Sequence, residues 1–261
     1  MSSTPHELSH AHSPLSRFFA REVSTGSKLL KRIRHDLFDL IQVCLGDLKQ
    51  TNELRALMSD LNKGTVPAHW CKFKMPRGTA VNQYINNLAA RLAQLERLAD
   101  GAVEAQQDVW LGGLFQPEAY ITATRQAVAH ERGWSLEQLV LSMDISQTGG
   151  QGAFAIQGML PFIMSFSSST LTCIILGLTL QGASWTSGRL QLNEGQAILL
   201  PPSQLTWKRH DEAPRTSGAT LVNLPVYLNG DRNDVLFSVD LETDEEDGDV
   251  IVQRGVCLTA A

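Results

Sequence analysis

Apolar residues recur every three or four positions through the first half of the chain, which is the period of an amphipathic α-helix. This spacing predicts helices over residues 15–41, 53–61 and 81–98. Gly64 followed by Pro67 is typical of a helix end. Pro117 predicts the first turn of another helix, because its fixed φ suits that position. Ser135 and Gln138 then predict a short helix with a capping box.

After about Leu141 the period changes to two, in short runs separated by Gly, Pro, Asn and Asp. These runs predict strands at 190–192, 204–208, 219–223, 226–228 and 235–241. Six acids in the eight positions 242–249 predict a solvated loop. We therefore expect an α+β fold: an N-terminal helical subdomain over residues 14–142, then a small antiparallel β-barrel or sandwich over 143–261. Residues 1–13 are expected to be disordered.

Composition narrows the function classes. The hydrophobic fraction of 43% is ample for a buried core. A net charge of −5 and a pI near 5.8 argue against a protein whose main task is to bind nucleic acid. The four cysteines show no CxxC spacing, which favours reduced thiols over a zinc site or a disulfide framework. The first residues lack the basic start and apolar stretch of a signal peptide, which argues against secretion.

The sequence contains few patterns that carry chemistry. Residues 24–28, STGSK, resemble a phosphate-binding loop, but the required Gly-Lys-Ser/Thr spacing is missing and the segment lies in a helical pattern. His130 and Glu131 do not extend to HExxH, and no GxSxG presents a serine nucleophile. His6, His10 and His12 lie in a Pro/Ser-rich terminus that cannot fix metal geometry. We therefore expect no catalytic residue, no cofactor and no metal ligand.

The densest motif is WLGGLFQPEAYITATRQ at residues 110–126, followed by WSLEQL at 134–139. It resembles the extreme C-terminal region of a dynein heavy chain, most closely the cytoplasmic type. Further matching motifs are SRFFAREV at 16–23, KQTN at 49–52, KGTVPAHW at 63–70, LQGA at 180–183, LPVYLN at 224–229 and RGV at 254–256. The resemblance runs from about Pro14 to the end of the chain, and motifs this long and collinear are specific.

The resemblance implies a C-terminal domain that packs on the ring of a minus-end-directed microtubule motor and modulates its output. In that family ATP hydrolysis belongs to ring modules upstream, so we expect a non-catalytic fragment of a dynein heavy chain. Its expected partners are the ring modules of the same parent chain and, indirectly, the other subunits of the dynein complex, in the cytoplasm and on the cytoskeleton. Nucleic acid is not expected as a partner, and membrane is disfavoured.

The family-signature residues expected to serve a structural or interface role are Trp110, Gly112, Gly113, Leu114, Phe115, Pro117, Glu118, Ala119, Tyr120, Thr122, Arg125 and Gln126. We expect them to shape a loop and a helix rather than a ligand site, because they offer no nucleophile–base pair and no metal cluster. Glu118 and Arg125 are candidates for an ion pair within or between modules. Ile121 and Val128 are available for packing.

One stretch breaks the family pattern. Ile145 to Gly188, 44 residues, carries no charged side chain and no histidine, and relatives would continue directly from 154–158 to 178–182, without residues 159–177. Three interpretations exist: a membrane-spanning run over 159–180, an extra hairpin, and a retained intron. Pro161 and a hydroxyl-rich stretch at 165–170 argue against the membrane run. We favour the intron, because codons for 158–159, 171–172 and 176–177 can contain donor, branch and acceptor sites. The alternative function is a membrane-anchored interaction protein, and a free-standing enzyme ranks third.

Overall fold

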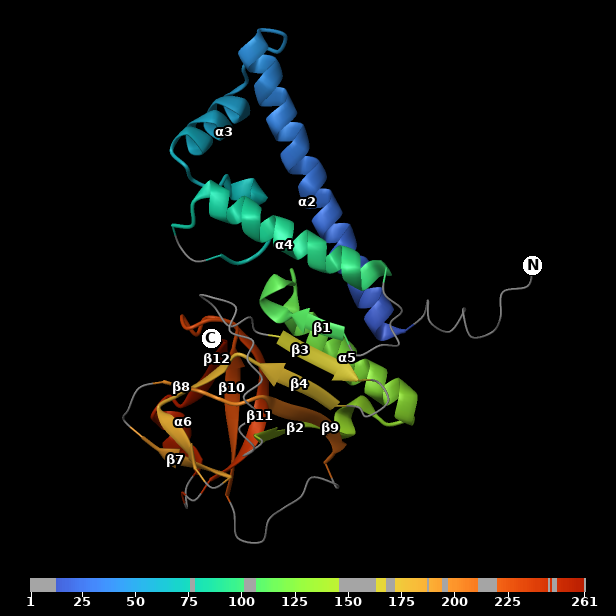
Figure 1. Ribbon diagram of the computed structural model, residues 1–261, viewed down its shortest axis with the longest axis vertical. Helices are drawn as coiled ribbons and strands as arrows, with labels where there is room; N and C mark the ends of the chain where they lie inside the picture. The colour runs from blue at the N-terminus through green and yellow to red at the C-terminus, as the bar shows by residue number, and fades with distance from the viewer. Residues whose placement is uncertain are drawn as a thin grey trace, which may run out of the picture. The chain divides into compact units, whose positions relative to one another are not determined.

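The computed structural model describes residues 13–75, 78–100, 107–145, 163–167, 172–186, 188–193, 197–210, 220–243, 245 and 248–260 (Figure 1). The chain divides into two compact units. The helical unit comprises residues 16–102 and 113–116, and the β unit comprises residues 1–15, 103–112 and 117–261. Of the N-terminal segment expected to be disordered, residues 1–12 lie outside the described residues.

The helical unit contains most of α2 (Pro14–Leu45), together with α3 (Asn52–Asn62), the 3-10 turn η1 (Ala68–Trp70) and α4 (Val81–Asp100). These helices confirm the three predicted from apolar spacing, with α2 extended at its C-terminal end. Gly64 has φ +70°, a left-handed conformation that a residue with Cβ adopts at a cost, and it stops α3. The Thr51 hydroxyl caps the start of α3 by accepting from the Leu54 N–H at 3.2 Å.

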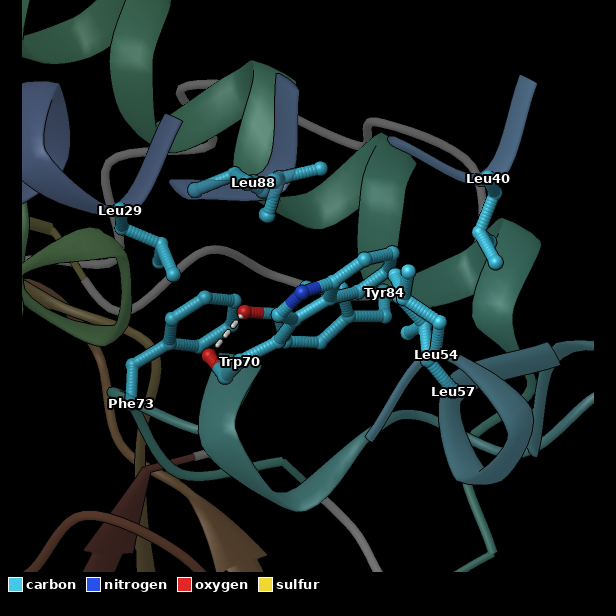
Figure 2. Close-up of a cluster of buried hydrophobic side chains, with 9 residues drawn as sticks. Leu29, Leu40, Leu54, Leu57, Trp70, Phe73, Tyr84 and Leu88 are labelled. Carbon is cyan, nitrogen blue, oxygen red and sulfur yellow. Dashed lines mark hydrogen bonds between the residues drawn. The ribbon is translucent and has the colours of Figure 1, made fainter. Parts of the chain in front are cut away.

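An aromatic cluster forms the centre of the helical core (Figure 2). Trp70 and Tyr84 are each 1% exposed, and the Phe73 and Tyr84 rings stack with centroids 4.9 Å apart. The Tyr84 hydroxyl donates to the Trp70 carbonyl at 2.5 Å. Each fully buried aromatic or leucine stabilises the fold by about 1.5–3 kcal/mol. The other buried members are Leu29, Ile33, Leu40, Leu54, Leu57 and Leu88.

The β unit contains two further helices, α5 (Pro117–Arg132) and α6 (Gly248–Gln253), and two 3-10 turns, η2 (Leu111–Gly113) and η3 (Leu136–Gln138), the last residue of η2 belonging to the helical unit. Its described strands are β1 (Gln107–Trp110), β2 (Leu139–Ile145), β3 (Ile163–Ser167), β4 (Thr172–Leu176), β5 (Leu178–Gln181), β6 (Ala183–Thr186), β7 (Arg189–Leu192), β8 (Ile198–Leu199), β9 (Ser203–Arg209), β10 (Thr220–Tyr227), β11 (Val235–Thr243) and β12 (Cys257–Ala260).

The sheet is open, so the predicted barrel is wrong. Its hydrogen-bonded order is β1-β3-β4-β9-β2-β11-β10-β12-β5-β8, with β6 and β7 attached beside β11. A barrel closes only when the two end strands pair with each other. Within the described residues β1 pairs only with β3, and the two-residue β8 pairs only with β5. Most pairings are antiparallel as expected, but β10–β12, β11–β2 and β11–β7 are parallel.

The helix-then-strand order is confirmed. Each predicted strand coincides with an observed strand apart from its end residues, with one merger, and residue 219 lies outside the described residues. The strands predicted at 219–223 and 226–228 are a single strand, β10, with Pro225 inside it. Proline is tolerated in a strand where its missing N–H faces no partner. Next to Pro225, β12 pairs with β10 only at Val226 and Tyr227. Ser135 makes no side-chain cap, so the predicted capped helix is only the turn η3.

Two segments with unusual composition also have strand or helix residues. The acidic stretch 242–249, predicted as a loop, differs from that prediction at both ends, because its first two residues end β11 and its last two begin α6. Within the predicted insertion 159–177, residues 163–167 and 172–176 form β3 and β4, which pair with each other and lie between β1 and β9. These strands match the hairpin interpretation. The retained intron stays a prediction, because it concerns the transcript.

Candidate functional site: the signature block and the outer face of α2

The signature block, residues 110–126, alternates between the two units along the sequence. Trp110 and Gly112 belong to the β unit, residues 113–116 to the helical unit, and the helix from Pro117 onward to the β unit again. The predicted helix start at Pro117 is confirmed, and the turn η2 precedes it in the sequence. A Cβ built on Gly112 would lie 2.8 Å from the Trp110 Nε1, so any larger residue there would force the indole to shift.

Two buried charges hold the segment 113–116 within the helical unit. The Glu22 carboxylate on α2 accepts hydrogen bonds from the N–H groups of Phe115 and Gln116, at 2.6 and 3.1 Å. Arg91 on α4 donates from Nη1 to the Leu114 carbonyl at 2.7 Å. Glu22 is 3% exposed and Arg91 4% exposed. Hydrogen bonds to charged groups contribute more than neutral ones, so this segment is firmly anchored.

The Arg91 guanidinium is supported on several sides. Its Nε donates to the Asn87 side-chain oxygen at 2.7 Å, and its Cζ lies 4.0 Å from the centroid of the Phe73 ring. Burial lowers the pKa of Arg91 to about 10, against the opposing effect of the negative charge of Glu22. The side chain is therefore still a cation at neutral pH, and it offsets the Glu22 charge.

Phe115 joins the helical core. Its ring centroid lies 5.8 Å from that of Phe73 in an edge-on arrangement. A Cβ built on Gly26 of α2 would lie 3.2 Å from the Phe115 ring and 2.8 Å from Leu92. The segment that resembled a phosphate-binding loop is thus the middle of α2, and its glycine is a packing position.

The rest of the block forms the first three turns of α5. Pro117, Tyr120, Ile121 and Val128 are buried, and Ala119 is half-buried. Glu118, Thr122 and Gln126 are exposed. Within the described residues Glu118 and Arg125 do not pair with each other, and the Arg125 Nη2 donates to the carbonyls of Leu136 and Leu139. Arg125 thereby ties α5 to the turn η3 and to the start of β2. Pairing with another module stays a prediction.

Arg125 also lines a cavity of about 310 Å³ between α5, β2 and β11. Its polar lining includes Asn223 and Asp240, whose side chains bond to each other at 2.7 Å. The Trp207 indole, also in the lining, donates to the Thr124 hydroxyl at 3.2 Å, and that hydroxyl donates to the Ile121 carbonyl at 2.8 Å. These two pairs satisfy each other's polar groups, whereas the buried Arg125 Nε has no hydrogen-bond partner among the described residues. The lining holds no nucleophile beside a base.

Asp36 is a second buried acid that the sequence did not single out. Its Oδ2 accepts from the Trp70 indole at 2.8 Å and contacts His69 Nε2 at 2.7 Å, while Oδ1 pairs with Arg32 at 3.0 Å. Burial raises the pKa of Asp36, but the two hydrogen bonds and the charge of Arg32 outweigh burial and hold that pKa below its usual value. The sequence did contain a signal for Asp36, because it is an acid on the apolar face of a predicted helix, where acids are rare unless they are paired. Glu22 lies on the same face of the same helix.

The C-terminal part of α2 presents an apolar surface, which we call the apolar patch. Phe38 is 58% exposed, Ile41 56% and Leu45 67%. Leu37 on the same helix and Leu48 just beyond it are also exposed. Single exposed apolar residues are ordinary, whereas a contiguous group on one helix is typical of an interaction surface. A signal for this surface was present in the sequence: near its C-terminal end α2 carries apolar residues around more of its circumference than a single buried face requires.

The remaining chemistry-bearing groups form no site within the described residues. All four cysteines are free, with Cys44 and Cys71 exposed and Cys173 and Cys257 buried. Burial raises the pKa of both buried thiols. The described residues contain no group of three His, Cys, Asp or Glu that could hold a metal ion, and His6, His10 and His12 lie outside them.

The membrane interpretation of residues 159–180 is not favoured. A helix that crosses a bilayer needs about 20 consecutive apolar residues. No helix in the described part of the protein has both the length and the apolar character that a span requires. The described residues of this run are in the strands β3, β4 and β5 and the turn at Gly177.

Comparison with known proteins agrees with the resemblance seen in the sequence. The family model for the C-terminal domain of dynein heavy chains matches residues 2–260. The protein is 38% identical over 254 residues to the cytoplasmic dynein heavy chain of Drosophila melanogaster, and the match spans 94% of this chain and 5% of the relative. The corresponding protein of Dictyostelium discoideum is 36% identical over 236 residues, spanning 89% of this chain and 5% of the relative.

The cytoplasmic dynein heavy chain of Caenorhabditis elegans is 38% identical over 248 residues, spanning 95% of this chain and again 5% of the relative. The protein thus spans about one-twentieth of the length of the curated relatives it matches. Nearly every residue from the first helix to the last strand falls within the match. It therefore belongs to the family of dynein heavy chains, as a member of their C-terminal domain family.

Proposed function

We propose that this protein serves a cytoplasmic dynein motor as a non-catalytic domain that docks on the motor ring and modulates its movement along microtubules. The relatives are named cytoplasmic dynein heavy chains, which supports a cytoplasmic location and a place in the dynein complex. The signature residues would then serve the domain's own architecture, with segment 113–116 anchored on Glu22 and Arg91.

The apolar patch is the observation that carries the docking proposal. Phe38, Ile41 and Leu45 are each more than half exposed on one helix, and the match spans only 5% of the relatives' length. A ring surface that covered the patch would remove this apolar area from water. Covering the exposed half of one such side chain contributes about 1 kcal/mol.

A binding experiment tests the docking. The purified protein is titrated into a cytoplasmic dynein motor that ends before its own C-terminal domain. The double variant F38Q/I41Q keeps good helix formers and removes the two central apolar groups. We expect it to bind about thirtyfold more weakly than the wild type, since about 2 kcal/mol is lost. Val252, half-exposed on α6, supplies the control V252Q, which should bind within twofold of the wild type. Equal binding of F38Q/I41Q and wild type would overturn the docking surface.

Two further measurements test the non-catalytic and modulating parts. The purified protein should hydrolyse ATP no faster than a buffer blank, and robust hydrolysis by it would refute the non-catalytic part. Adding the protein back to the shortened motor should change the speed or the stall force of single motors on microtubules. Identical traces with and without it would refute modulation.

A further inference from the structure

The cations of α2 lie on its exposed side, whereas two of its three acids lie on its buried side. The helix carries six cations, and all of them are exposed. Of its three acids, Glu22 and Asp36 point into the core and only Asp39 is partly exposed. The outside of this helix is therefore strongly basic, although the whole protein has a net charge of −5.

Five of the cations share one narrow stripe. At 100° per residue, Arg17, Arg21, Lys28, Lys31 and Arg32 fall within a sector of about 100°, whose centre lies about 120° around the helix from the buried face. We call these five residues the basic stripe. From Arg17 to Arg32 the stripe runs about 22 Å along the helix axis. The apolar patch lies about a third of a turn around the helix and nearer its C-terminal end.

Four of the five stripe cations have no ion-pair partner among the described residues. Arg32 pairs with Asp36 at 3.0 Å, whereas the other four cations form no ion pair with any residue that the structure describes. Like charges three or four residues apart destabilise a helix by about 0.2–0.5 kcal/mol per pair. Solvated helix faces normally intersperse both signs, which removes this cost. A face that keeps the repulsion is suited to a partner that supplies the missing negative charge.

The spacing suits an extended acidic polypeptide. The rise from Arg17 to Arg21 and from Lys28 to Arg32 is about 6 Å in each case. Alternate side chains of an extended polypeptide lie about 6.6 Å apart, and seven residues span about 23 Å. Three of the five cations are arginines, whose guanidinium groups bind carboxylates through two parallel hydrogen bonds. Between Arg17 and Arg32 the sector of the stripe holds no aromatic or amide side chain for stacking on bases or reading their edges. His35, which follows in the same sector, lies 3.6 Å from Asp39, whose negative charge would repel a phosphate. Both features disfavour nucleic acid.

We propose that the basic stripe binds an extended segment of about seven residues, rich in Asp and Glu, on a partner protein. This surface is separate from the apolar patch, so either can fail alone. The affinity arises mainly from charge, and it therefore falls as salt rises. The helical unit offers the partner a preformed rigid row, because α2 is fixed by its buried face before binding.

Fluorescence anisotropy tests the proposal with a fluorescein-labelled heptapeptide that alternates Glu and Ser. The variant R17Q/R21Q/K28Q lowers the charge of the stripe by three, and R34Q/K63Q/K72Q lowers the net charge equally at exposed positions elsewhere in the helical unit. At 50 mM salt we expect the stripe variant to bind at least tenfold more weakly than the wild type, and the control variant within threefold of it. The wild-type affinity should fall severalfold at 300 mM salt.

Further measurements test whether the binding depends on the acidic side chains and whether the variants stay folded. A peptide with Gln in place of Glu should not bind, and circular dichroism should show the same helix content in all variants. A short DNA duplex and vesicles containing phosphatidylserine should bind more weakly than the acidic peptide. Equal binding by the stripe and control variants, binding of the Gln peptide, or tighter binding of DNA or vesicles would each overturn the proposal.

Discussion

Replacing Glu22 with glutamine should release the segment 113–116 from the helical unit. The carboxylate accepts two backbone hydrogen bonds, at 2.6 and 3.1 Å, and its charge offsets that of buried Arg91. A hydrogen bond to a charged group contributes about 1.5–3 kcal/mol, and glutamine keeps one neutral acceptor in the same place. Arg91 would meanwhile lose a nearby negative charge. We therefore expect E22Q to lower the free energy of opening this segment by about 3 kcal/mol.

Hydrogen exchange followed by mass spectrometry measures this opening directly. At neutral pH, 3 kcal/mol corresponds to roughly a hundredfold faster exchange of the Phe115 and Gln116 amides. The matched control is R17Q, an exposed charge on the same helix, which should leave those amides within threefold of the wild type. If E22Q exchanges there at the wild-type rate, Glu22 does not anchor the segment and the reasoning from its burial fails.

Three substitutions and one transcript measurement have definite expected outcomes. G26A should lower the urea midpoint of unfolding, because the new Cβ would lie 2.8 Å from the Leu92 side chain. The cost of overpacking, about 1–3 kcal/mol, exceeds the gain of about 1 kcal/mol from the higher helix propensity of alanine. A raised midpoint would contradict this. T124V should cost about 1–3 kcal/mol by leaving the Trp207 indole N–H unpaired, whereas T124S should cost less. D36N should lower the free energy of unfolding at pH 7. The difference from the wild type should shrink below about pH 4, because a carboxyl group whose pKa is depressed by folding stabilises the protein only at a pH where it is ionised. A difference that stays constant from pH 3 to 7 would refute this role of Asp36. Most transcripts should lack the 57 nucleotides for residues 159–177, as sequencing of cDNA across these codons would show, whereas abundant translated transcript that retains them would refute the intron.

Helices and strands were predictable from the sequence wherever the local pattern of apolar residues, or the fixed φ of a proline, is enough to specify them. The helix over 81–98 follows from apolar spacing, and the start of α5 follows from the fixed φ of Pro117. The barrel prediction failed because closure depends on how the end strands pair, and strand periodicity contains no such information. Pro225 likewise suggested a break in a strand that continues, since its tolerance depends on where β12 begins.

The electrostatic features were least visible in the sequence. Glu22 bonds to a residue 93 positions away and Asp36 to one 34 positions away, so no local pattern contains either partner. The net charge of −5 argued against a protein whose main task is to bind nucleic acid. That sum over the whole sequence conceals one helix on which the cations point outward and two of the three acids point inward. Burial of the acids is what makes the outer face of α2 basic, and burial is a tertiary property.

The return of residues 113–116 to the helical unit has a consequence for synthesis on the ribosome. The helices α2, α3 and α4 are complete once Asp100 has been made, but Glu22 and Arg91 still await their backbone partners at Leu114, Phe115 and Gln116. A nascent polypeptide that ends at residue 102 would carry both side chains without these bonds. The helical unit should therefore gain full protection from proteases only after Gln116 has left the exit tunnel, even though its helices precede that residue.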